Sequence, residues 1–173
     1  MKVLIPILIG FLVVGCGGSK EKATPETQAK AEPKKPEAVP VVTVTIDNPI
    51  LEKAIREWLD KPAAELTQAD LEKLPGLSLE SLQLTDVKDL EKLPQLKALD
   101  LSSNKLTSVN GLEKLTQLTM LNLEDNQLTD VKGLENLTKL NGLHLKDNPD
   151  LTKAQIEELQ KALPKCEITH NAK

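Results

Sequence analysis

The sequence predicts a short repeat solenoid of the α/β class, with parallel strands on one face and 3₁₀-like returns on the other. Apolar residues recur with a period of 22 positions over most of the chain, which is typical of stacked repeats. Leu supplies 32 of the 173 residues, whereas Phe and Trp occur once each and Tyr is absent, so Leu must build the core almost alone. A chain of this length allows one domain with appendages.

The composition argues against several kinds of function. Aromatic residues make up only 1% of the chain, and sugar-binding platforms, base-stacking sites and aromatic cation cages all need rings. The formal net charge is -4 with Lys and Arg dispersed, which argues against a nucleic-acid partner. Neither His has a nucleophile placed by a recognised turn, and there is no Gly-rich phosphate loop. We therefore expect no catalytic residue, no cofactor and no enzymatic activity.

Residues 1–15 are expected to be a signal peptide. A positive start at Lys2 is followed by an almost wholly apolar run over residues 3–14. A membrane-spanning helix needs about 20 apolar residues, so this run is too short and is typical of a secretory signal. The segment VVGC at residues 13–16 resembles the lipobox of bacterial lipoproteins. An ordinary signal peptide with a chance Cys is the alternative.

The lipobox resemblance implies that Cys16 is lipidated and anchors the protein to a membrane. In that family the signal is cut before the Cys, which carries two or three acyl chains. That number anchors stably, whereas one chain alone is marginal. Gly17 rather than Asp follows the Cys, which in a Gram-negative lipoprotein favours the outer membrane. The resemblance therefore implies a location in the bacterial cell envelope.

Residues 16–40 begin with Cys16 and continue as a tether rich in Lys, Glu, Pro and Ala. The tether cannot bury enough apolar area to offset the entropy of ordering, so we expect it to be disordered. A flexible chain of this length averages about 25–30 Å from end to end. The tether is expected to lift the folded domain off the lipid surface. The alternative is that it binds the cell wall or a partner itself.

Residues 41–73 are expected to form a helical N-terminal cap. The segment Asp47-Asn48-Pro49 offers a residue that can cap a helix, followed by Pro at a first-turn position. Thr67 can start a second, short helix. Alternating Val and Thr over residues 41–46 suggest an additional strand at the entrance of the array. The apolar face of the first helix is expected to contain Leu51, Ile55, Trp58 and Leu59.

Residues 74–173 contain the repeats and a C-terminal cap. In one unit, Leu99 and Leu101 alternate with polar residues and are expected to point inward from a short strand. Asn104 is expected to turn inward, where its amide satisfies backbone groups that the bend deprives of partners. An apolar residue at every third position then suits a tight 3₁₀-like return. This return contains Leu106, Val109, Leu112, Leu115 and Leu118, and the same types recur 22 residues earlier and later.

The C-terminal cap is expected to be a helix followed by a strand. Residues 152–155, TKAQ, match a capping box. In the strand we align Cys166 and Ile168 with Leu143 and Leu145, an offset of 23 residues. Cys166 is then a buried free thiol in an inward column, and a redox or metal-binding role is the alternative. The helix face contains Ile156, Leu159 and Leu163.

The pattern over about residues 47–171 resembles the leucine-rich repeat family, and within it the 22-residue internalin-like class of bacteria. The segment DNPILEKAIREWLDKPAAELTQADLEKL is similar to the helical N-terminal cap of that class. The resemblance implies that the outward strand residues form a concave face, which is the usual ligand surface of such arrays. It also implies a protein partner.

Polar residues are expected to form three rows across the concave face, with neighbours in a row about 4.8 Å apart. The rows are Ser78, Asp100, Asn122, His144 and Glu167; Glu80, Ser102, Glu124, Lys146 and Thr169; and Ser81, Ser103, Asp125, Asp147 and His170. At this spacing His144 can pair with Glu167, and Glu124 with Lys146. The candidate partner-binding residues are Asp100, Asn122, Glu124, His144 and Lys146.

Two other interpretations of these rows remain open. The simpler one is a plain, solvated polar face. The other is a cation held by Asp125, Asp147 and His170, but no rigid ligand loop supports such a site. We therefore expect no metal.

Two hypotheses about function follow. The first is a lipid-anchored, monomeric interaction module that presents its concave face to a protein partner. The second is a structural or envelope-associated lipoprotein without a tight specific partner. The three rows contain no Trp, Tyr or Arg, the residue types that dominate interface hot spots, which argues against a tight interaction.

Overall fold

The structure, a computed structural model, describes residues 42–173, which form a solenoid of stacked repeats. The expected signal peptide, the expected lipidation at Cys16 and the expected tether therefore lie outside the described residues. Among the described residues, no helix has the length and apolar character that a membrane crossing requires. The elements are α1 (Pro49–Trp58), α2 (Gln68–Leu71), β1 (Gly76–Ser78), η1 (Lys88–Lys92), β2 (Ala98–Asp100), η2 (Leu112–Lys114), β3 (Met120–Asn122), η3 (Leu134–Asn136), β4 (Gly142–His144), α3 (Lys153–Ala162) and β5 (Glu167–Thr169).

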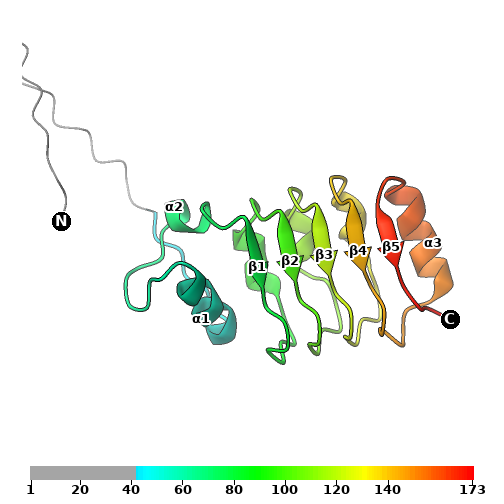
Figure 1. The fold of residues 1–173 in the computed structure, drawn as a ribbon, viewed down its shortest axis with the longest axis horizontal. Helices are drawn as coiled ribbons and strands as arrows, with labels where there is room; N and C mark the ends of the chain where they lie inside the picture. The colour runs from blue at the N-terminus through cyan, green and yellow to red at the C-terminus, as the bar shows by residue number, and fades with distance from the viewer. Residues whose placement is uncertain (1–41) are drawn as a thin grey trace, which may run out of the picture. The chain divides into compact units, whose positions relative to one another are not determined.

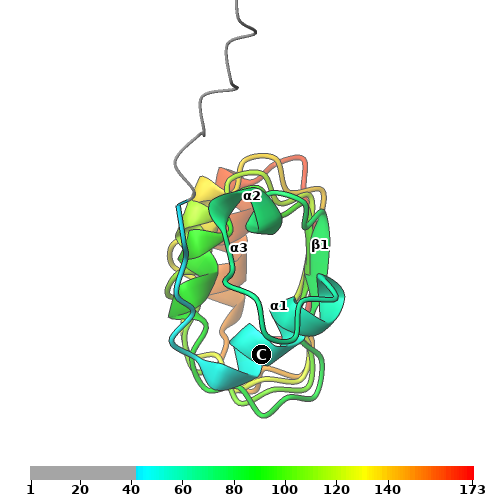
Figure 2. The same ribbon diagram turned by 90° about the vertical axis from the view of Figure 1, so that its left-hand side faces the viewer.

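The five strands form one parallel sheet in the order β1-β2-β3-β4-β5, and the predicted 22-residue register is confirmed for the first four (Figure 1). Figure 2 looks along the array and shows the strands on one side of the coil and the 3₁₀ helices and α3 on the other. The Leu and Val columns fill the space between these two sides and are buried. Leu77, Leu99, Leu121 and Leu143 are partners across the sheet.

The predicted register of the last strand is wrong. Leu143 pairs with Ile168, so the offset from β4 to β5 is 25 residues and not 23. The return before β5 is the ten-residue helix α3 in place of a 3₁₀ turn. A helix advances only about 1.5 Å per residue, so a helical return needs more residues to cross the same distance. Thr169, and not Glu167, therefore lies beside His144.

The capping box of α3 and the buried thiol are confirmed. Thr152 accepts from the backbone N–H of Gln155, whose side chain reaches back to the backbone N–H of Thr152. Cys166 is a free cysteine and only 5% exposed. Burial raises the pKa of its thiol, and the neighbouring carboxylate of Glu167 acts in the same direction. Cys166 thus fills the core as a small apolar side chain.

The inward Asn column is confirmed as a ladder that joins successive repeats. Asn104, Asn126 and Asn148 are 7%, 4% and 2% exposed. The Nδ2 of Asn126 donates to the carbonyls of Leu101, Leu123 and Glu124, and its Oδ1 accepts from the N–H of Leu106. Asn104 and Asn148 repeat this pattern one unit earlier and one unit later.

The N-terminal cap is confirmed in outline. The Asn48 side chain accepts from the N–H groups of Ile50 and Leu51 at the start of α1, and Pro49 stands in the first turn. Leu51 and Ile55 are buried, but Trp58 is 49% exposed, so its expected place in the buried face is wrong. Trp58 is the last residue of the helix, and Leu59 packs against the core after it.

The expected strand over residues 41–46 is also wrong for the part that the structure describes. Thr43 forms a single antiparallel bridge with Thr67. The N–H of Val44 donates to the carbonyl of Leu66, and the N–H of Gln68 donates to the carbonyl of Val42. The segment is therefore pinned to the start of α2 and adds no strand to the sheet.

Asp89 ties the cap to the first repeat, a contact that the sequence did not indicate. Its Oδ2 accepts from the backbone N–H groups of Asp47 and Asn48, each at 2.8 Å, and its Oδ1 accepts from Lys92 Nζ at 2.6 Å. Burial acts to raise the pKa of Asp89, but these hydrogen bonds outweigh it and hold the pKa below its ordinary value. The carboxylate therefore favours the docked position of α1.

Asp70 makes the stability of the cap dependent on pH. Hydrogen bonds from Lys61, Thr67 and Lys73 hold the pKa of its carboxyl well below the ordinary value, although burial opposes them. A lowered pKa in the folded state stabilises the fold above about pH 4, and this contribution is lost as the pH falls toward the lowered pKa.

We therefore expect Asp70→Asn to flatten the dependence of unfolding free energy on pH below about pH 4. Urea titrations at a series of acidic pH values measure this slope. Asp150→Asn, at an exposed position in the last repeat, is the control and should leave the slope unchanged. An unaltered slope in Asp70→Asn contradicts the assignment.

Two glycines in equivalent positions differ in the space around them. Gly111 and Gly133 have φ of 96° and 100°, so Ala is strained at both. A Cβ on Gly111 would lie 2.7 Å from the Cα of Lys88, whereas the nearest atom to one on Gly133 is Glu113 Cβ at 3.4 Å. We expect Gly133→Ala to cost about 1 kcal/mol and Gly111→Ala about 3 kcal/mol, measured by urea unfolding. Equal costs would mean that backbone strain alone decides the outcome.

Candidate functional site

The solvent-facing surface of the sheet, called here the concave face, carries the first predicted row on β1 to β4. Ser78, Asp100, Asn122 and His144 are aligned across four adjacent strands. Of the remaining candidates, Glu124 and Lys146 follow two residues after Asn122 and His144 and belong to the second row. The structure therefore brings the five candidate residues together on one surface.

Hydrogen bonds to neighbouring groups hold three of these candidates in place. Asp100 Oδ1 accepts from the N–H and the hydroxyl of Ser102, at 2.9 and 2.6 Å. Asn122 Oδ1 accepts from the N–H of Glu124 at 3.1 Å. His144 Nδ1 lies 3.0 Å from Thr169 Oγ1. The protein itself therefore orients Asp100, Asn122 and His144 before any partner arrives.

The two pairs proposed between neighbours within a row are not formed. The shifted register of β5 removes Glu167 from His144. No ion pair joins Glu124 to Lys146 within 4.0 Å. Both residues of the second pair are available to a partner.

The alternative cation site is not supported. Asp147 Oδ1 accepts from the Nδ2 of Asn171 at 2.8 Å, and the shifted register of β5 displaces His170 from the third row. Within residues 42–173, no group of three or more His, Cys, Asp and Glu side chains is placed to hold a metal ion.

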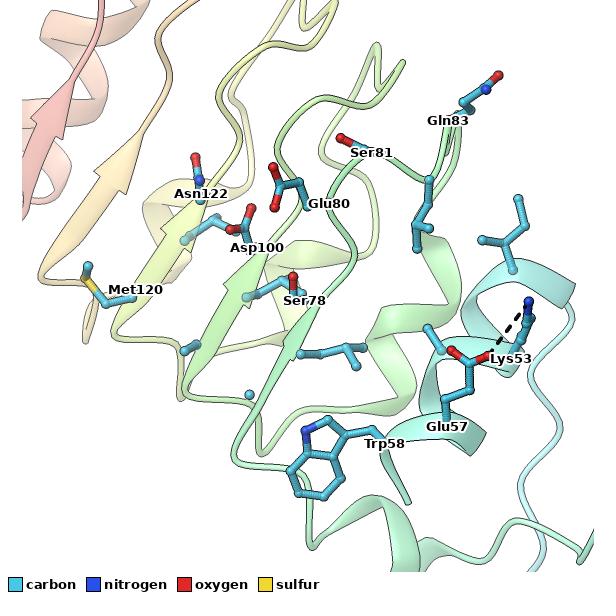
Figure 3. Close-up of a pocket in the computed structure, with 18 of the residues that line it drawn as sticks. Lys53, Glu57, Trp58, Ser78, Glu80, Ser81, Gln83, Asp100, Met120 and Asn122 are labelled. Carbon is cyan, nitrogen blue, oxygen red and sulfur yellow. Dashed lines mark ion pairs between the residues drawn. The ribbon is translucent and has the colours of Figure 1, made fainter. Parts of the chain in front are cut away.

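A groove of about 1390 Å³ lies between α1 and the concave face (Figure 3). The sheet forms its floor, and the outward face of α1 forms one wall. The wall is lined by Ile50, Lys53, Glu57 and Trp58, among others, and the floor includes the whole first row from Ser78 to His144. This wall is the part of the site that sequence reasoning missed.

A further row on the same side of the sheet was also missed. Gly76, Ala98, Met120 and Gly142 stand two positions before the first polar row and therefore point to the same side of the sheet. Met120 is 48% exposed, and its sulfur lies 2.5 Å from where a Cβ on Gly142 would stand. The period of two residues was the signal that could have found this row, because it extends each strand backward as well as forward.

The groove therefore combines an apolar strip with acidic side chains. Ala98, Met120 and Trp58 line it together with Glu80 and Asp100. On the wall, Lys53 and Glu57 form an exposed ion pair at 3.8 Å (Figure 3). This surface can recognise a partner by shape and charge.

Comparisons with known proteins support this description of the fold. Residues 73–128 match the sequence model of the leucine-rich repeat family. The solved structure of internalin C2 from Listeria monocytogenes is 27% identical, with a TM-score of 0.61 over 69% of this chain and 52% of that chain. The internalin InlF from the same species is 24% identical, with a TM-score of 0.53 over 72% of this chain and 44% of that chain. No curated protein matches the chain.

The described residues thus form a leucine-rich repeat solenoid with an internalin-like arrangement of strands, 3₁₀ turns and helical cap. The chain spans about half the length of the two internalin structures. Solenoids of this kind use their extended concave surfaces for binding and are interaction modules.

Proposed function

We propose that the protein is a membrane-anchored interaction module that binds a protein partner on its concave face. The observation that carries this proposal is the groove between α1 and the sheet. It exposes Trp58, the chain's single tryptophan, and Met120 beside a fixed row of polar side chains. Trp is enriched at interface hot spots and Met at protein interfaces.

A second candidate is a structural or envelope-associated lipoprotein without a tight partner. The observation that favours it is the composition of the three polar rows, which contain no Trp, Tyr or Arg. The exposed Trp58 wall weighs against this candidate, because the groove supplies the aromatic anchor that the rows lack.

Photo-crosslinking in intact cells distinguishes the two candidates. A photo-reactive amino acid at Ser78, in the groove, is compared with one at Thr138, which is exposed on the return side. We expect a saturable adduct from position 78 and none from position 138. Adducts of equal yield from both positions, or none, would favour the structural candidate.

The charged residues of the concave face provide the matched variants. We expect a triple charge reversal, Asp100→Lys, Glu124→Lys and Lys146→Glu, to abolish the adduct. Charge reversal at Glu135 on η3 and at Glu158 on α3, which are both exposed, should leave the adduct intact. An adduct that survives the triple reversal would contradict binding at the concave face.

Membrane anchoring is proposed through lipid on Cys16, in the bacterial cell envelope and, in a Gram-negative cell, at the outer membrane. The lipobox-like segment VVGC supports this proposal. Two or three acyl chains bind membranes stably, so we expect Cys16→Ser to move the protein from the membrane fraction to the soluble fraction.

Mass spectrometry should at the same time show that the acyl mass is lost from the Cys16→Ser variant. Cys166→Ala is the control, because Cys166 is buried in the folded domain, and it should keep both the acyl mass and the membrane fraction. Unchanged partitioning of Cys16→Ser would exclude lipid at Cys16 as the anchor.

A further inference from the structure

We infer that the groove between α1 and strands β1 to β4 binds a short extended segment of the partner in which an Arg or Lys stands next to an apolar residue. This inference rests on the proposed function and specifies the chemistry of the partner. It follows from the exposed apolar side chains of the groove, its charge and its length.

Exposed apolar side chains are concentrated in the groove. Only four large hydrophobic residues are exposed in the described part of the chain, namely Val42, Ile50, Trp58 and Met120. Three of them, Ile50, Trp58 and Met120, line the groove, with exposures of 40%, 49% and 48%. In a domain whose other Leu, Ile and Val side chains fill the core, this concentration marks a surface that a partner covers.

The charge of the groove is negative. Its charged lining residues are Lys53, Glu57, Glu80 and Asp100. Lys53 is paired with Glu57 at 3.8 Å, which leaves the carboxylates of Glu80 and Asp100. Neither of these two forms an ion pair within residues 42–173. A cationic side chain is the complementary group.

The indole of Trp58 strengthens the preference for Arg or Lys. Trp is the best aromatic partner for a cation placed over the face of its ring. Trp58 stands on the wall, across the floor from Asp100 (Figure 3). The groove therefore offers a cationic side chain an aromatic face at Trp58 and the carboxylates of Glu80 and Asp100, and it offers a neighbouring apolar side chain the surface of Met120.

The dimensions suit a short extended segment. The groove reaches from β1 to His144 on β4. Strands in a sheet are about 4.8 Å apart, so the floor is about 14 Å long, and an extended chain covers this length with four or five residues. The backbone groups of β2 and β3 are paired on both sides within the sheet, so the segment is recognised through its side chains.

A random octapeptide library displayed on phage tests the inference on the intact protein. We expect selection to enrich peptides that carry Arg or Lys beside an apolar residue. Trp58 fluorescence then measures the affinity of a selected synthetic peptide. We expect Glu80→Gln combined with Asp100→Asn to weaken that affinity about tenfold, because two attractive charges are lost.

Glu135→Gln combined with Glu158→Gln is the matched control. These residues line a second acidic groove, beside α3, which contains no aromatic residue. The control pair should not change the affinity. Selection of acidic or uncharged peptides, no selection at all, or an unchanged affinity in the Glu80 and Asp100 variant would overturn the inference.

The two proposals fail separately. If the triple charge reversal abolishes the adduct while Glu80→Gln combined with Asp100→Asn leaves it unchanged, that result would support the interaction module and contradict the basic segment. If position 78 gives no adduct in intact cells and the library selects no peptide, both proposals are contradicted.

Discussion

Replacing Asn126 with Ala should lower the free energy of unfolding by about 3 kcal/mol, measured by urea denaturation. The substitution removes the acceptor of the buried N–H of Leu106, which then has no partner, and three donated bonds to carbonyls. An unsatisfied buried donor costs about 1–3 kcal/mol by itself. Asn136→Ala is the control on an exposed position of η3 and should change stability by less than about 0.5 kcal/mol.

Substitutions at neighbouring Asn residues of the ladder should not be additive in their effect on unfolding free energy. The carbonyl of Leu101 accepts from both Asn104 Nδ2 at 2.9 Å and Asn126 Nδ2 at 3.0 Å. Either single substitution leaves that carbonyl one partner, whereas the double substitution removes both. We expect the double variant to lose about 1 kcal/mol more than the sum of the single variants. Simple additivity would show that the ladder acts as independent units.

The repeats were predictable because each of their features is local. The alternation of Leu99 and Leu101 with polar residues predicts a strand, and the Asn column predicts the bend that follows the strand. The same apolar residues recur 22 positions apart, so the register between neighbouring strands requires no knowledge of three-dimensional contacts. The one error in register, at Ile168, arose where a helix replaced the 3₁₀ return.

The groove was not predictable in the same way. Its floor can be obtained from the strand period, but its wall depends on how α1 docks against the first repeat. That docking relies on Asp89 Oδ2, which binds the N–H groups of two residues more than 40 positions earlier in the chain. Helical periodicity predicted that Trp58 lies on the buried face of α1. In the structure α1 ends at Trp58, and Leu59, which follows the helix, packs against the core instead.

Ile55→Ala should detach this wall, with an expected loss of about 3 kcal/mol in unfolding free energy. Ile55 is fully buried, and α1 has only ten residues. Helices of that length are marginal alone, so the helix depends on burial of Leu51 and Ile55 in the hydrophobic core. Trp58 lies at the end of the same helix, and its fluorescence should report an unfolding transition of the cap at lower urea than in the unaltered protein.

Ile50→Ala separates this structural contribution from the binding contribution. Ile50 is on the same helix but is 40% exposed and lines the groove. We expect Ile50→Ala to change stability by less than about 1 kcal/mol while it weakens binding of a selected peptide. Ile55→Ala should weaken that binding only at urea concentrations where the cap unfolds. If both variants lost stability equally, α1 would be held by its whole surface, and its outward face would not be free to form the wall of a binding site.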